Sequence, residues 1–144
     1  MARTLAKDHD EKRLQIMSTA AAVLARDGVD RASMASVAQA CGVSKANIYH
    51  YHRSKEDLLF DLLSEHLTAL SERVISADDP SANTEERFRI AVSEILSAYK
   101  GADDHHRIQM QTLNVLALDK QKALRDIQRD LVAHVSSIIR DFDR

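Results

Sequence analysis

The 144-residue sequence predicts an all-α protein, and three observations support this fold class. Only three glycines and one proline are present, so the turns that a β-protein needs are scarce. With 44% hydrophobic and 29% charged residues, the composition is that of a globular chain. Apolar residues recur at intervals of three and four along most of the chain, which is the period of an amphipathic helix. No segment favours a strand over a helix.

The first third of the chain predicts three helices. The first is expected over residues 11–27, with a left-handed stop at Gly28. Its apolar stripe consists of Leu14, Met17, Ala21 and Leu24. A short second helix is expected between the N-cap Ser33 and the stop Gly42, and a third over residues 45–51 behind a serine cap. Two short helices joined by a glycine-containing turn are a helix-turn-helix.

The rest of the chain predicts four more helices. A capping sequence at Ser54 begins a fourth helix that continues to Ile75 and is about 30 Å long. Residues 76–83 form the one plausible joint between domains. Helices are then expected from Thr84, as a cap, to Gly101, from about Asp103 to Leu118, and from about Asp119 onward. The apolar stripe of the last helix is Leu124, Ile127, Leu131, Val135, Ile138 and Phe142.

The outer face of the third predicted helix carries side chains that suit nucleic acid. With Ile48 pointing inward, the outer half holds Ala46, Asn47, Tyr49 and His50, and Lys45 lies in the exposed first turn. Asparagine bonds adenine edges, a tyrosine hydroxyl bonds phosphates or bases, and a small alanine admits a thymine methyl. Lys45, Arg53 and Lys55 can meet phosphates. The alternative is an ordinary solvent-exposed helix.

The distribution of charge along the chain agrees with binding of a polyanion by its first part. Residues 1–60 carry nine basic and seven acidic side chains, whereas residues 61–144 carry eleven basic and fifteen acidic ones. A mildly basic first part before an acidic second part favours nucleic-acid binding by the first part.

Several short motifs follow one another in a characteristic order between Ile16 and Leu59. They are Gly28, Ser33, Val37-Ala38, Gly42-Val43-Ser44, Ile48-Tyr49 and Ser54-Lys55-Glu56. Together they resemble the N-terminal DNA-binding domain of the TetR/AcrR family of bacterial transcriptional regulators. The resemblance implies recognition positions at Lys45, Ala46, Asn47, Tyr49 and His50, and phosphate-contact positions at Ser33, Met34, Tyr49, Tyr51 and Lys55. His52 stands where the family usually has phenylalanine.

The resemblance also implies an architecture and a function. A helix-turn-helix domain (residues 1–54) would be joined by a connecting helix (55–77) to a helical effector-binding and dimerisation domain (78–144), incomplete by comparison with the family. The chain would be a repressor that binds double-stranded operator DNA as a homodimer and is released by a small-molecule effector. The dimer interface is expected in a missing tail, which leaves the last helix largely intramolecular. Candidate pocket residues, each of which also suits an ordinary core, are Phe88, Val92, Tyr99, Met110, Leu113, Leu131 and His134.

Two other functions remain open: a helical ligand-binding or interaction protein that has lost DNA binding, and a DNA-binding activator or architectural protein without a ligand. No enzyme, cofactor or metal site is expected, because no catalytic pattern appears and neither His50 with His52 nor residues 103–106 has good ligand spacing. Cys41 is expected to be a small core residue rather than a redox sensor. Without a signal peptide or a long apolar run, the chain is expected to be cytoplasmic, with no membrane partner.

Overall fold

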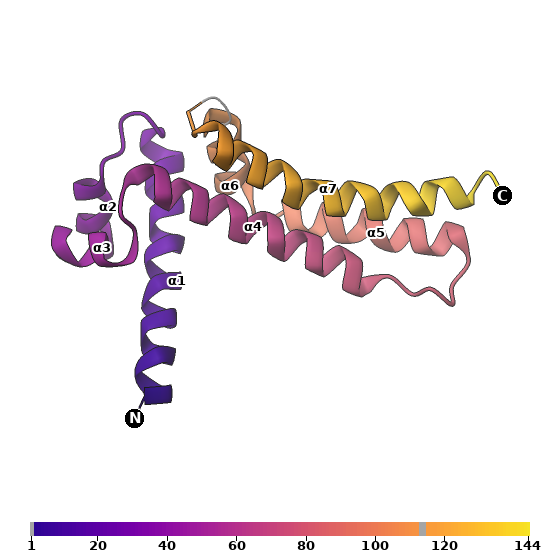
Figure 1. Ribbon diagram of the computed structural model, residues 1–144, viewed down its shortest axis with the longest axis horizontal. Helices are drawn as coiled ribbons and strands as arrows, with labels where there is room; N and C mark the ends of the chain where they lie inside the picture. Colours follow the sequence, from indigo (N-terminus) through magenta and orange to yellow (C-terminus); the bar gives the residue numbers. More distant parts are fainter. Residues whose placement is uncertain (1, 113–114) are drawn as a thin grey trace. The chain divides into compact units, whose positions relative to one another are not determined.

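The structure, a computed structural model, describes residues 2–112 and 115–144, and in these residues it contains helices and no strand (Figure 1). The predicted all-α fold class is therefore confirmed. The helices are α1 (Ala2–Asp27), α2 (Met34–Cys41), α3 (Lys45–Tyr51), α4 (Lys55–Ala77), α5 (Thr84–Tyr99), α6 (Asp103–Thr112) and α7 (Leu118–Asp141).

The chain divides into two compact units. The first comprises Met1–Leu62 with Asp104–Leu116, and the second comprises Leu63–Asp103 with Ala117–Arg144. Helix α4 contributes its first part to one unit and its remainder to the other. The sequence-based boundaries assign all of residues 78–144 to the effector-binding domain, whereas in the structure α6 packs with the helix-turn-helix. None of the helices in the described residues is both long and apolar enough to cross a membrane.

In the first unit α2 packs against α1, and α3 packs against α2 (Figure 1). Its core contains fully buried side chains from five helices, which are Ile16, Leu24, Val37, Ile48, Leu58, Leu59 and Ile108. The predicted limits of α2 and α3 are confirmed. Gly42 has φ +69°, and the N–H of Val43 donates to the carbonyl of Ala38 at 3.1 Å, which closes α2 as a Schellman-type stop.

Helix α1 begins nine residues earlier than residue 11, where the sequence predicted it. The additional segment has no buried residue, so no apolar stripe marks it. It is helical because its alanine, leucine, lysine and arginine residues favour helices. Lys7 and Glu11, four positions apart, add an ion pair on the surface of the helix. The predicted stripe is also corrected at Leu14, which is exposed, while Ile16 is buried in its place.

The second unit is a packed set of α5, α7 and the later part of α4. Its core cluster consists of Leu70, Val74, Ala91 and Ile138, with Phe88, Ile95, Ala98 and Leu131 packed against it. Leu131 and Ile138 belong to the stripe predicted for the last helix, so this part of the stripe serves the unit's own core. Phe142 at the end of that stripe is half-exposed, and its ring meets Phe88 edge to face.

Two predicted helix ends in the second half of the chain are wrong by a few residues. Asn83, not Thr84, is the N-cap of α5, because its side-chain oxygen accepts from the N–H of Glu86 at 2.8 Å. Helix α6 ends at Thr112 rather than at Leu118. The carbonyl of Thr112 accepts hydrogen bonds from the N–H groups of both Val115 and Leu116, and α7 begins at Leu118.

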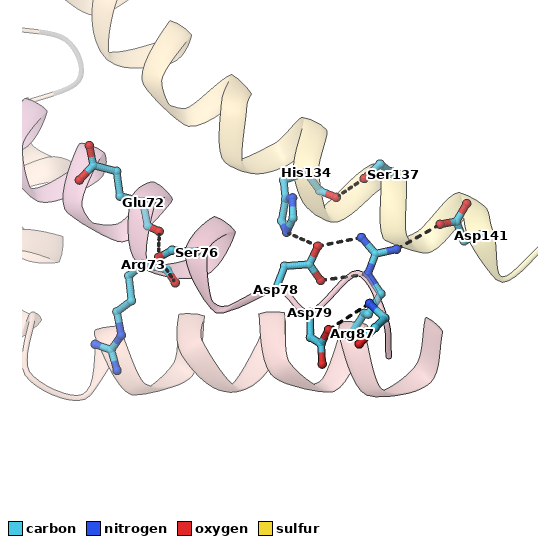
Figure 2. A network of polar contacts seen from close by, with 10 residues as sticks. Glu72, Arg73, Ser76, Asp78, Asp79, Arg87, His134, Ser137 and Asp141 are labelled. Atoms are coloured by element: carbon cyan, nitrogen blue, oxygen red, sulfur yellow. Dashed lines mark hydrogen bonds and ion pairs between the residues drawn. The ribbon is translucent and has the colours of Figure 1, made fainter. Parts of the chain in front are cut away.

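A polar network joins three segments of the second unit around Asp78 (Figure 2). Arg87 donates two hydrogen bonds to the Asp78 carboxylate at 2.8 and 2.9 Å, and its remaining nitrogen lies 3.5 Å from Asp141. Nε2 of His134 lies 3.9 Å from the same carboxylate. The Arg87 hydrogen bonds lower the pKa of Asp78, and the nearby positive charge adds to this effect. The network ties the turn after α4 to α5 and α7.

This network predicts a pH-dependent contribution to stability. Because the folded pKa of Asp78 lies below its unfolded value of about 3.9, the contribution is present above that value and is lost as the pH falls through the folded pKa. Arg87→Met should therefore lower Tm at neutral pH, and the difference from wild type should shrink in strong acid. Arg89→Met, on the exposed side of α5, is the control. An equal Tm difference at both pH values would contradict this role.

Candidate nucleic-acid interface

Helix α3 is held in place by its two ends and by one buried side chain. The hydroxyl of Ser44 accepts from the N–H of Asn47 at 3.0 Å and caps the first turn. Ile48 is completely buried, as predicted, and anchors the inner face against the first unit's core. The opposite face is thereby fixed outward.

The predicted recognition residues lie on this outward face. Lys45, Ala46 and His50 are exposed, Tyr49 is 42% exposed, and Asn47 is half-buried. The face therefore offers one cation, an amide, a phenol and an imidazole on a helix of seven residues. This set can donate and accept hydrogen bonds at base edges and phosphates.

At the start of α2, the hydroxyl of Ser33 is exposed to solvent, whereas the side chain of Met34 is buried. Ser33 is exposed and forms a capping box with Ser36, in which each hydroxyl accepts from the other residue's N–H. Met34, the other phosphate-contact position implied here, is 5% exposed. Its side chain packs in the core and is therefore not available to a phosphate.

A group of aromatic rings continues the surface beyond α3. The ring of Tyr51 lies 4.7 Å from His9 and 5.4 Å from His50, measured between centroids. His9 belongs to the part of α1 that the sequence pattern missed. Only the absence of a helix breaker before residue 11 could have indicated that this side chain reaches α3.

Lys55 has surroundings that differ from those of a phosphate-contact residue. Its ammonium donates to the carbonyls of Val29 at 2.7 Å and Ala32 at 3.0 Å, and lies 3.4 Å from that of Asp30. The three donors of a lysine are thus directed at the turn between α1 and α2. This geometry favours a positioning role for Lys55 over the phosphate contact expected from the resemblance.

The surroundings of His52 show how the chain accommodates a histidine at the end of α3, where the family usually has phenylalanine. Its side chain has no exposed surface, and Nδ1 lies 2.9 Å from Oδ2 of Asp61 on α4. Arg13 of α1 approaches the same oxygen at 3.9 Å. The imidazole therefore fills a buried aromatic position and adds a polar link from α3 to α4.

The predicted pocket residues are distributed rather than gathered. Phe88 and Leu131 pack against the second unit's core, and His134 joins the Asp78 network. Tyr99 and Met110 are exposed, Val92 is half-buried, and Leu113 lies outside the described residues. Met110 belongs to the first unit, whereas the other described members belong to the second.

A groove of about 660 Å³ in the second unit contains none of the predicted pocket residues. It is lined by Thr68, Ser71, Glu72, Ile75, Ser76 and Asp130, from α4 and α7. Five of these residues lie on α4, where all but the buried Ser71 are on the exposed side of the helix, and Asp130 lies on α7. Helical periodicity predicts only a solvated face for such polar positions, so no sequence pattern marks this groove.

Neither a metal centre nor a reactive thiol stands out within residues 2–112 and 115–144. No three His, Cys, Asp or Glu side chains converge there as metal ligands. Cys41 is half-buried, and burial raises the pKa of its thiol. A raised pKa reduces the thiolate fraction on which cysteine reactivity depends.

Comparison with known proteins places the helix-turn-helix in a family. Residues 16–62 match the family model described as bacterial regulatory proteins, tetR family. The fatty acid metabolism regulator protein of Bacillus subtilis is 26% identical over 136 residues, which are 94% of this chain and 64% of that protein.

Solved structures agree with this assignment. A TetR-family transcriptional regulator from Bordetella parapertussis is 36% identical, with a TM-score of 0.79 over 88% of this chain and 66% of that one. AibR, solved with isovaleryl coenzyme A and operator DNA, is 26% identical, with a TM-score of 0.73 over 88% of this chain and 70% of that one. The chain thus spans about two thirds of the length of these proteins. It belongs to the TetR family of bacterial regulatory proteins.

Proposed function

We propose that the protein is a transcriptional repressor that binds operator DNA through α3. The observation that carries this proposal is the outward face of α3, where Lys45, Asn47 and Tyr49 lie on a helix whose other side is anchored by Ile48. A rigidly held recognition helix with such side chains can enter a major groove and contact base edges. The exposed Ser33 hydroxyl at the start of α2 is a candidate contact to the phosphate backbone of the DNA.

The proposal includes control by a small molecule. AibR, whose structure was solved with an acyl-coenzyme A and operator DNA, supports an effector of this general kind. The groove along α4 has a volume in the range typical of small-molecule sites, about 300–1,000 Å³. Its Glu72 and Asp130 carboxylates suit hydrogen-bond donors or cations better than phosphates, so a coenzyme A moiety would have to lie elsewhere.

We further propose that a homodimer is the working unit. One short helix reads only a few base pairs, and two-fold pairing presents two recognition helices to successive major grooves about 34–36 Å apart. In α7 the side chains of Leu124 and Ile138 are buried within the chain, whereas Val132 and Ile139 are exposed. The second pair is therefore available for contacts beyond the chain's own core.

Selection of duplexes from a random pool by the wild-type chain tests the proposal. We expect enrichment of a two-fold symmetric site, and binding to it is then measured by fluorescence anisotropy. Enrichment of no sequence would favour the alternative of a helical ligand-binding or interaction protein.

Asn47→Ala should relax the sequence preference of the protein. Because an asparagine amide bonds a base edge, its loss should cost about 1–3 kcal/mol at one base pair of the selected site and little at others. Binding to duplexes with single base-pair changes measures this pattern. A uniform loss of affinity at every position would assign Asn47 to the phosphate backbone instead.

A further inference from the structure

The turn between α1 and α2 closes differently from the turn between α2 and α3. Both begin with a left-handed glycine, Gly28 with φ +89° and Gly42 with φ +69°. After Gly42, the N–H of Val43 donates back to a carbonyl of its own helix. After Gly28, the N–H of Val29 instead donates to Oε1 of Gln111 at 3.0 Å, 82 positions away on α6. The first turn is therefore completed by another helix.

The Val29 residue is held from both sides. Its N–H is bonded by Gln111, and its carbonyl accepts the shortest of the Lys55 hydrogen bonds, at 2.7 Å. The side chain of Val29 is 1% exposed, so the residue has little room to adjust. The Ala32 carbonyl, next to the cap Ser33, accepts from the same ammonium at 3.0 Å. The turn that sets the direction of α2 thus depends on α4 and α6.

Helix α6 is well suited to place Gln111. Ile108 and Thr112, one turn before and immediately after Gln111, are completely buried in the first unit. Gln111 itself is exposed, so its amide reaches Val29 from the surface of an anchored helix. Its replacement leaves the buried side chains of the unit intact.

We propose that Gln111 is a positioning residue for DNA binding, which acts by holding the Val29 peptide at the entry to the helix-turn-helix. This inference rests on the proposed operator binding through α3. Loss of the Gln111 acceptor would free the Val29 N–H and let the turn before Ser33 vary, so α2 and α3 would be less well placed on a specific site. Gln111 would make no contact with phosphate, so the salt dependence of binding would be unchanged.

The test compares three variants of the full 144-residue chain. Gln111→Met removes the acceptor oxygen at similar length, Gln111→Glu keeps an oxygen there, and Gln109→Met is the same substitution elsewhere on α6. Amide exchange at Val29 is followed by NMR. Affinity for a duplex selected by the wild-type chain, and for a scrambled duplex of equal length, is measured by anisotropy at several salt concentrations.

For Gln111→Met we expect faster exchange of the Val29 amide, about fivefold weaker binding to the selected duplex, and an unchanged salt slope. Gln111→Glu and Gln109→Met should bind as wild type does. Wild-type affinity in Gln111→Met, or an equal loss in Gln111→Glu, would overturn the inference while operator binding stands. A wild-type chain that selects no duplex would overturn operator binding and this role with it.

Discussion

Lys55→Met is expected to lower the free energy of unfolding by about 2 kcal/mol, because hydrogen bonds from a charged donor contribute about 1.5–3 kcal/mol. The ammonium of Lys55 bridges the carbonyls of Val29 and Ala32, so its loss leaves both without this donor. DNA affinity should fall with the loss of order in the turn before α2. Urea denaturation measures the first effect, and anisotropy with a selected duplex measures the second.

The salt dependence of binding distinguishes a positioning lysine from a phosphate contact. Removal of a phosphate contact lowers the slope of log affinity against log salt by about one. We expect Lys55→Met to leave this slope unchanged and Lys45→Met to lower it, with little change in the stability of the latter variant because Lys45 is exposed. Equal reductions of the slope in the two variants would restore the phosphate role that the family resemblance implies for Lys55.

The sequence predicted the helix-turn-helix well because local signals define it. Ser33, Gly42 and Ser44 act within four residues of their hydrogen-bond partners, and Ile48 is the one large aliphatic side chain in α3. The fold class and the limits of α2 and α3 follow from such local patterns. The early start of α1 was missed because a helix without a buried face has no apolar period.

The candidate site was only partly predictable, since burial and long-range contacts decide the roles of its residues. Met34 and Lys55 occupy positions of the family motif, yet one side chain is buried and the other is bonded to a turn more than 20 positions away. The link between Gln111 and Val29 spans 82 positions and leaves no periodic trace. Pattern analysis identifies which face of a helix is available, but not which distant donor or acceptor a turn will require.

Gly42→Val is expected to lower the free energy of unfolding by more than about 1–2 kcal/mol, the penalty for a side chain with a β-carbon in the left-handed region. Gly42 has φ +69°, and an added β-carbon would meet no atom within 4 Å, so the cost arises from the backbone rather than from a clash. If valine drives the residue out of this conformation, the bond from Val43 to Ala38 is lost and α3 turns away from α2. Operator affinity should then fall together with stability.

Two matched substitutions separate backbone strain from the effect of added bulk. Gly101→Val adds the same side chain at a glycine that also has open space but no positive φ, and should change stability by less than about 0.5 kcal/mol. Gly42→Asn should retain much of the stability, because asparagine enters the left-handed region more readily than valine does. Urea denaturation and anisotropy of all three variants measure both quantities. Wild-type stability and DNA affinity in Gly42→Val would show that the direction of α3 does not depend on the left-handed conformation of Gly42.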